Sequence, residues 1–93
     1  METQKVTRTF VIINELGLHA RAAAAFVKTA SRFKSQIRVY KNSTVVDGKS
    51  IMGVLMLAAA KGSVIKIEAE GIDAEKAIEE LGQLINDRFG EER

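Results

Sequence analysis

The sequence contains no cysteine, no proline, no tryptophan and only one histidine. The absence of cysteine excludes a disulfide framework, thiolate catalysis and every zinc site built from cysteine. A single histidine cannot form a His-rich metal site, and no second histidine is present to complete a hydrolytic triad elsewhere in the chain. We therefore expect neither a metal nor another cofactor.

Long hydrophobic runs are also missing. The longest nearly apolar stretch covers residues 51–60 and is interrupted by Gly53, which is too short to cross about 30 Å of hydrocarbon. Residues 1–5 lack the apolar segment and the small-residue cleavage site of a signal peptide. These features predict a cytoplasmic protein with no membrane partner.

The charges nearly cancel, since 14 Lys and Arg oppose 12 Asp and Glu to leave a net charge of +2. There is no basic run and no set of aromatic residues on which bases could stack. We therefore expect no nucleic-acid partner. A small nucleic-acid-binding module remains the remote alternative, and its candidate contacts are Lys28, Arg32, Lys34 and Arg38.

The chain has the size and composition of one globular domain. Its 93 residues are 46% hydrophobic and 28% charged, a balance that disfavours disorder. No linker or solenoid repeat divides it. We therefore expect one domain spanning residues 1–93.

Alternating apolar residues predict four strands, and apolar residues spaced three and four apart predict three helices. Gly17 is the expected turn residue after the first strand, Ser50 and Asp73 are expected N-caps of the second and third helices, and Gly90 is expected to end the last helix. The predicted strands cover residues 6–13, 35–41, 44–46 and 63–69, and the predicted helices cover residues 20–32, 51–60 and 74–89. This β-α-β-β-α-β-α order favours an α+β sandwich with one covered sheet face and an open face rich in Lys, Arg, Thr and Glu.

His19 stands immediately before the first predicted helix, in the segment Gly17-Leu18-His19-Ala20-Arg21. A helix N-terminus offers unpaired N–H groups and partial positive charge, which attract phosphate. A neutral imidazole is a nucleophile, and the guanidinium of Arg21 matches the shape of a phosphoryl group. The segment therefore suits a phosphorylatable histidine, although a purely structural histidine at the helix start is the alternative that local spacing leaves open.

Ser50 precedes the second predicted helix. Its expected structural role is that of an N-cap, and a phosphate at this position would be tolerated by the helix amides. Ile51 and Met52 follow, and both cannot face the core if Val54 and Leu55 do. At least one of them should therefore be exposed and available for docking.

Two segments about thirty residues apart, Gly17–Arg21 and Lys49-Ser50-Ile51-Met52-Gly53-Val54, resemble the histidine-containing phosphocarrier (HPr) family of the sugar phosphotransferase system. The resemblance extends from about Val6 to Phe89. It implies an open-faced sandwich in which a four-stranded antiparallel sheet is covered on one face by three helices.

The resemblance also implies a role for each matching residue. His19 would accept a phosphoryl group on Nδ1 from enzyme I, which phosphoenolpyruvate charges, and pass it to an enzyme IIA domain. Arg21 would assist the transfer, and Ser50 would be phosphorylated by HPr kinase/phosphorylase. The protein would then be a relay and not an enzyme, expected to be a monomer, and its partner-docking residues would be Ala20, Lys49, Ile51 and Met52.

One position departs from the family pattern. The family usually has proline directly after the arginine, whereas this chain has Ala22. Proline would fix the first helical turn, so we expect a slightly more mobile His19 loop with transfer retained. A regulatory or nitrogen-related branch of the family, signalling instead of feeding transport, is the closer alternative, although the Ser50 motif favours the kinase-regulated branch.

Overall fold

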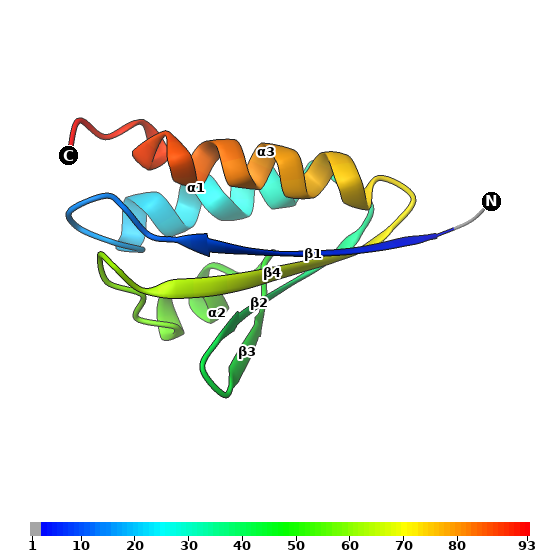
Figure 1. Ribbon diagram of the computed structural model, residues 1–93, viewed down its shortest axis with the longest axis horizontal. Coiled ribbons are helices and arrows are strands. Elements are labelled where there is room, and N and C mark those ends of the chain that lie inside the picture. Colours follow the sequence, from blue (N-terminus) through cyan, green and yellow to red (C-terminus); the bar gives the residue numbers. More distant parts are fainter. Residues whose placement is uncertain (1–2) are drawn as a thin grey trace.

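The computed structural model describes residues 3–93 as a four-stranded sheet packed against helices (Figure 1). The strands are β1 (Gln4–Val11), β2 (Gln36–Lys41), β3 (Thr44–Asp47) and β4 (Val64–Gly71). The helices are α1 (Ala20–Ala30), α2 (Ile51–Met56) and α3 (Ala74–Asn86), followed by the one-turn segment η1 (Arg88–Gly90). No helix formed by these residues is long and apolar enough to cross a membrane.

The sheet has the strand order β1-β4-β2-β3, and every neighbouring pair is antiparallel. The register places Phe10 opposite Ile65 and Val39 opposite Ile67, so apolar side chains from adjacent strands share one face. This is the α+β open-faced sandwich, with the β-α-β-β-α-β-α order, that the sequence predicts.

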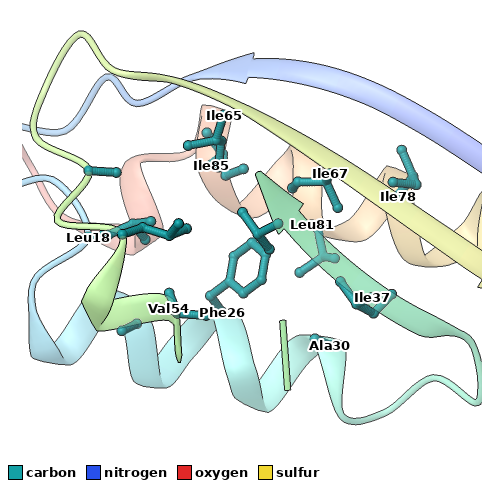
Figure 2. Close-up of a cluster of buried hydrophobic side chains, with 14 of the residues drawn as sticks. Leu18, Phe26, Ala30, Ile37, Val54, Ile65, Ile67, Ile78, Leu81 and Ile85 are labelled. Carbon is teal, nitrogen blue, oxygen red and sulfur yellow. The ribbon is translucent and has the colours of Figure 1, made fainter. Parts of the chain in front are cut away.

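The hydrophobic core lies between that apolar face and the helices (Figure 2). Phe26 of α1 and Leu81 of α3 are fully buried, and Val54 from α2 joins the same cluster. The inward residues of β4 alternate as Ile65, Ile67 and Ala69, all with no exposed surface. The alternation in the strands and the three- and four-residue spacing in the helices therefore identify the sheet face and the helix faces that pack together.

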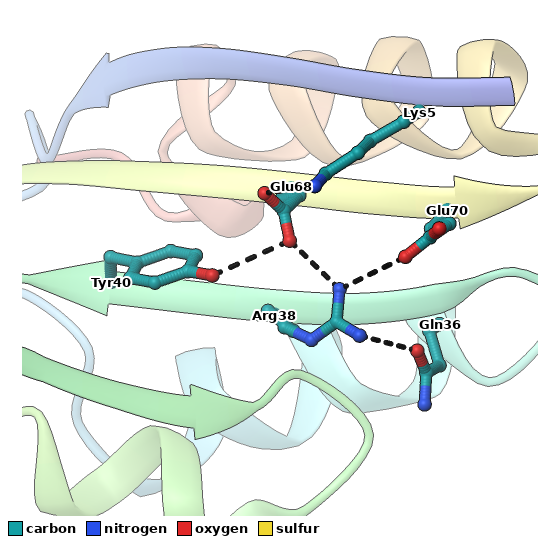
Figure 3. A network of polar contacts seen from close by, with 6 residues as sticks. All are labelled: Lys5, Gln36, Arg38, Tyr40, Glu68 and Glu70. Atoms are coloured by element: carbon teal, nitrogen blue, oxygen red, sulfur yellow. Dashed lines mark hydrogen bonds and ion pairs between the residues drawn. The ribbon is translucent and has the colours of Figure 1, made fainter.

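The opposite sheet face is open and carries a polar network centred on Glu68 (Figure 3). Arg38 donates to Glu68 at 2.8 Å and to Glu70 at 3.4 Å, and Lys5 lies 3.8 Å from Glu68. Desolvation of Glu68 opposes ionisation, but the hydrogen bond from Arg38 and the charge of Lys5 together leave the pKa of Glu68 below its usual value. The guanidinium of Arg38 is thus already paired with acidic side chains of its own sheet.

Most predicted boundaries are correct to within two residues, and the two larger differences lie at the ends of the second and third helices. The strand predicted over 6–13 ends at Val11, although the chain continues with hydrogen bonds between Ile12 and residues 62 and 63. The helix predicted over 51–60 ends at Met56, because Ala58 has a positive φ of 49°. The helix predicted over 74–89 ends at Asn86, and Gly90 lies in η1 instead of directly after the helix.

Asp73 precedes α3 as predicted, but its side chain does not cap that helix. It accepts hydrogen bonds from the amides of Lys34 and Ser35, both at 2.9 Å, and from the Ser35 hydroxyl. Burial opposes ionisation, yet these hydrogen bonds lower the pKa of Asp73. The carboxylate therefore joins the start of α3 to the segment before β2, a long-range role that local spacing could not reveal.

Candidate functional site

His19 occupies the N-cap position of α1. Its backbone is extended, with φ −72° and ψ 179°, and its carbonyl accepts the amide of Ala23 at 2.8 Å. The imidazole makes no capping hydrogen bond, and its side chain is 28% exposed. The ring is therefore held at the helix start but remains accessible from solution.

The turn before His19 depends on Gly17. Its φ is +66°, and a Cβ added there would lie 2.4 Å from the carbonyl oxygen of Ala59. The next amide, that of Leu18, donates to the same Ala59 oxygen at 2.9 Å. A side chain at position 17 would break this close approach, so glycine fixes the path of the chain into His19.

Arg21 lies in the first turn of α1 and is exposed. Its guanidinium forms no ion pair or hydrogen bond with the other residues from 3 to 93. The first turn of α1 contains no acidic residue, and its leading amides have no acceptor within the helix. His19 thus stands beside a free cation and a helix end, both of which favour an anion.

Glu91 also contacts His19, and no pattern in the sequence indicated this contact. Its Oε2 contacts Nε2 of His19, while its Oε1 accepts the amide Nδ2 of Asn14 at 2.9 Å. The hydrogen bond with His19, aided by that from Asn14 and by the charge of Arg21, lowers the pKa of Glu91. A carboxylate 72 residues away has no local spacing signal, so only the folded chain brings it to the imidazole.

Ser50 caps α2, as predicted, because its Oγ accepts the amide of Gly53 at 3.0 Å. Ile51 and Met52 are 46% and 70% exposed. The sequence required at least one of them to lie at the surface, and both do. The start of α2 therefore presents a hydroxyl next to two apolar side chains.

Lys49 has a structural contact that the sequence did not predict. Its ammonium donates to the carbonyl of Phe33 at 2.6 Å, and its amide donates to the side chain of Asp47 at 2.9 Å. The ammonium is therefore directed toward the segment after α1, and a docking role for Lys49 would have to coexist with this hydrogen bond.

The predicted site residues fall into two neighbouring groups. His19, Ala20 and Arg21 line one groove together with Leu16 and the segment 89–93. Lys49, Ser50, Ile51 and Met52 lie at the start of α2, which packs against α1. The hydrogen bond between Leu18 and Ala59 described above joins the turn before His19 to the segment after α2.

No cluster of three or more His, Cys, Asp and Glu side chains within residues 3–93 could hold a metal ion. The chemistry available at the groove is that of one imidazole, one free guanidinium, one bound carboxylate and the helix amides. Such a set can hold and exchange an anion such as a phosphoryl group.

Comparison with known families gives one match that covers most of the chain. The model for the PTS HPr component phosphorylation site matches residues 6–87. The phosphocarrier protein HPr of Neisseria meningitidis serogroup A is 59% identical over 80 residues, which cover 86% of this chain and 90% of that protein.

Solved structures agree with this similarity. A crystal structure of HPr-C-His from Thermoanaerobacter tengcongensis superimposes with a TM-score of 0.92 at 51% identity, covering 95% of this chain and 99% of that one. A structure described as an HPr dimer from the same organism gives a TM-score of 0.76 at 52% identity, covering 88% of this chain and 94% of that one. Similarity therefore extends through both sequence and fold.

Proposed function

This chain belongs to the HPr family of phosphocarrier proteins of the phosphotransferase system, and from that premise we propose that His19 carries the phosphoryl group. In this proposal the group arrives from phosphorylated enzyme I and leaves to an enzyme IIA domain. The observation that supports it best is the imidazole itself, partly exposed at the N-terminus of α1 beside Arg21. A buried ring could not meet two partners in turn.

The acceptor atom in this proposal is Nδ1. Because Glu91 occupies Nε2, Nδ1 is the nitrogen left to act as the nucleophile. Its lone pair attacks phosphorus, the bond between phosphorus and the donor atom breaks, and that electron pair leaves with the donor. Transfer to enzyme IIA is the same step in the opposite sense: the P–Nδ1 bond breaks and its electron pair returns to the imidazole.

Arg21 and the first amides of α1 stabilise the transferring group. The guanidinium forms no ion pair among residues 3–93, so it can turn toward phosphate oxygens without first breaking one. The helix amides add partial positive charge on the same side. Because these groups lie at the surface, the site can bind the phosphoryl group and still release it, as a relay must.

Ser50 is the proposed regulatory position, and a kinase of the HPr kinase/phosphorylase type is its proposed modifier. A phosphate there would sit at the start of α2, next to the exposed Ile51 and Met52. These two side chains, with Ala20, are the proposed docking surface for partners. Added negative charge on that surface would oppose the approach of a phosphorylated donor.

The protein is proposed to act as a relay and not as a multiple-turnover catalyst, as one domain and as a monomer in the cytoplasm. Whether it feeds transport or serves a regulatory branch depends on which enzyme IIA accepts its phosphate. The nucleic-acid alternative loses two of its four candidate cations, because Arg32 pairs with Glu80 and Arg38 pairs with Glu68.

The deciding experiment is incubation with enzyme I and phosphoenolpyruvate, followed by intact-mass spectrometry. We expect one acid-labile phosphoryl addition on the wild type and none on His19→Ala. Ser50→Ala is the matched control and should still take the label, because the donor does not act on serine. Label retained by His19→Ala, or a wild type that takes none, would refute the proposal.

A further inference from the structure

The carboxylate of Glu91 is the one charged group that touches the imidazole of His19 within residues 3–93. We propose that Glu91 is a positioning residue, which holds His19 with its proton on Nε2 and its lone pair on Nδ1. The inference rests on the proposed function of His19 and names a second residue on which that function depends.

The carboxylate is fixed through both of its oxygens. Oε2 is bonded to the imidazole, and Oε1 accepts a hydrogen bond from Asn14, which has no exposed surface. The same Asn14 amide donates to the carbonyl of Gly17 at 2.8 Å. A buried side chain therefore ties the carboxylate to the turn that carries His19, and the Glu91 side chain itself is only 15% exposed.

The backbone of residues 88–90 turns the chain so that Glu91 lies beside His19. Arg88, Phe89 and Gly90 have φ values of 55°, 56° and 79°, and the first two are in a conformation that L-residues with side chains rarely adopt. Phe89 is buried in the core cluster, which anchors the turn. The segment then passes beside the loop between β1 and α1 (Figure 1). Strain of this kind persists where the surrounding structure enforces it, and it is often found at functional sites.

The chemistry explains what this arrangement contributes. A carboxylate is an acceptor only, so a neutral imidazole bonded to it must place its proton on Nε2. Nδ1 then keeps the lone pair that attacks phosphorus. When the P–Nδ1 bond forms, positive charge develops on the ring while the Nε2 proton stays in place, and the fixed carboxylate stabilises that charge. On release the electron pair returns to the ring, and no proton has to move.

Three variants separate this role from a general effect of charge. Glu91→Ala removes the contact, and Glu79→Gln removes one negative charge from an exposed residue of α3 that does not line the groove. Glu91→Gln keeps an oxygen that can accept from Nε2 but loses the charge. Nitrogen-15 NMR of the His19 ring measures the tautomer, and the initial rate of labelling by enzyme I with phosphoenolpyruvate measures transfer.

We expect the neutral ring to be entirely the Nε2–H tautomer in the wild type and in Glu79→Gln, largely that tautomer in Glu91→Gln, and a mixture in Glu91→Ala. Labelling should slow about tenfold in Glu91→Ala, as for other residues that orient a functional imidazole, less in Glu91→Gln, and remain unchanged in Glu79→Gln. A wild-type tautomer ratio and rate in Glu91→Ala would overturn the inference. If no variant, the wild type included, takes label, the proposed function fails, while the tautomer measurement still decides whether Glu91 orients the ring.

Discussion

The ammonium of Lys49 lies 2.6 Å from the carbonyl oxygen of Phe33, so the residue that precedes Ser50 is tied to the segment that follows α1. Phe33 is itself buried in the core. The start of α2 is therefore held at two points: Lys49 contacts the segment that follows α1, and Ser50 caps the beginning of α2.

Lys49→Met should destabilise the fold, because it removes the charged donor from the Phe33 carbonyl while keeping an aliphatic side chain. We expect a loss of about 1 kcal/mol in the free energy of unfolding, measured by urea denaturation. Lys61→Met, which changes an exposed lysine, is the control and should be neutral. Equal midpoints for the two variants would show that the hydrogen bond contributes nothing.

Ser50→Asp should preserve the fold but slow phosphoryl acceptance by His19. Aspartate also caps helices, so Ser50→Asp should remain near wild-type stability, whereas Ser50→Ala should lose about 1 kcal/mol. The added charge should reduce the labelling rate by roughly tenfold at low salt and by less at high salt. Ser43→Asp, in the exposed turn between β2 and β3, adds the same charge away from the site; an equal effect there would contradict a local origin.

Ala22→Pro should reduce the mobility of the His19 loop. Position 22 lies in the first turn of α1, where an amide has no acceptor within the helix, so proline removes no helical hydrogen bond there. The residue is buried, and the ring must therefore fit against the core. We expect smaller backbone motions at residues 19–21 by NMR relaxation and a modest change in transfer rate. Identical dynamics and rates would defeat this prediction.

Asp73→Asn should weaken the fold in a pH-dependent manner. The pKa of Asp73 is lowered in the folded state from its ordinary value of 3.8, so its ionised form stabilises the protein above that value. This contribution is lost as the pH falls through the lower folded pKa. We expect the free energy of unfolding of Asp73→Asn to lie about 1–2 kcal/mol below that of the wild type near neutral pH. This difference should shrink below pH 3.8.

Urea denaturation as a function of pH measures this difference. Asp87→Asn is the matched control, because Asp87 is exposed and its side chain forms no hydrogen bond within residues 3–93. If the difference in the free energy of unfolding between wild type and Asp73→Asn stays constant down to the pH of acid unfolding, the ionised carboxylate is not the cause of that difference.

Gly90→Ala should destabilise the turn that places Glu91 beside His19. A Cβ at position 90 meets no atom within 4 Å, so its only penalty is the φ of +79°, worth about 1 kcal/mol. We expect a partial shift of the His19 tautomer toward Nδ1–H in NMR spectra and little change in core packing. An unchanged tautomer in a folded Gly90→Ala protein would show that the turn tolerates a side chain.

The sheet and helices were predictable because their signals are local. Alternation in residues 63–69 identifies the buried Ile65 and Ile67, and the three-four spacing of the last helix identifies Ile78 and Leu81. The confirmed cap at Ser50 is local too, since its partner lies three residues away.

The features that sequence reasoning missed all depend on distant parts of the chain. Asp73 was expected to cap its own helix, but it binds Ser35 across 38 residues. The early end of α2 reflects the left-handed Ala58, whose carbonyl accepts the ammonium of Lys41 at 3.2 Å. Glu91 gave no signal because its approach to His19 depends on left-handed Arg88 and Phe89, residue types that sequence patterns place in right-handed backbone.

The two ends of the described chain lie far apart, with β1 beginning at the end of the molecule opposite the start of α1 (Figure 1). Arg93 instead lines the same groove as His19. An affinity tag or fluorescent fusion attached after Arg93 would therefore begin within the groove and compete with incoming proteins for space. The same addition ahead of β1 would leave that approach clear, which makes the amino-terminal side the better point of attachment for labelling studies.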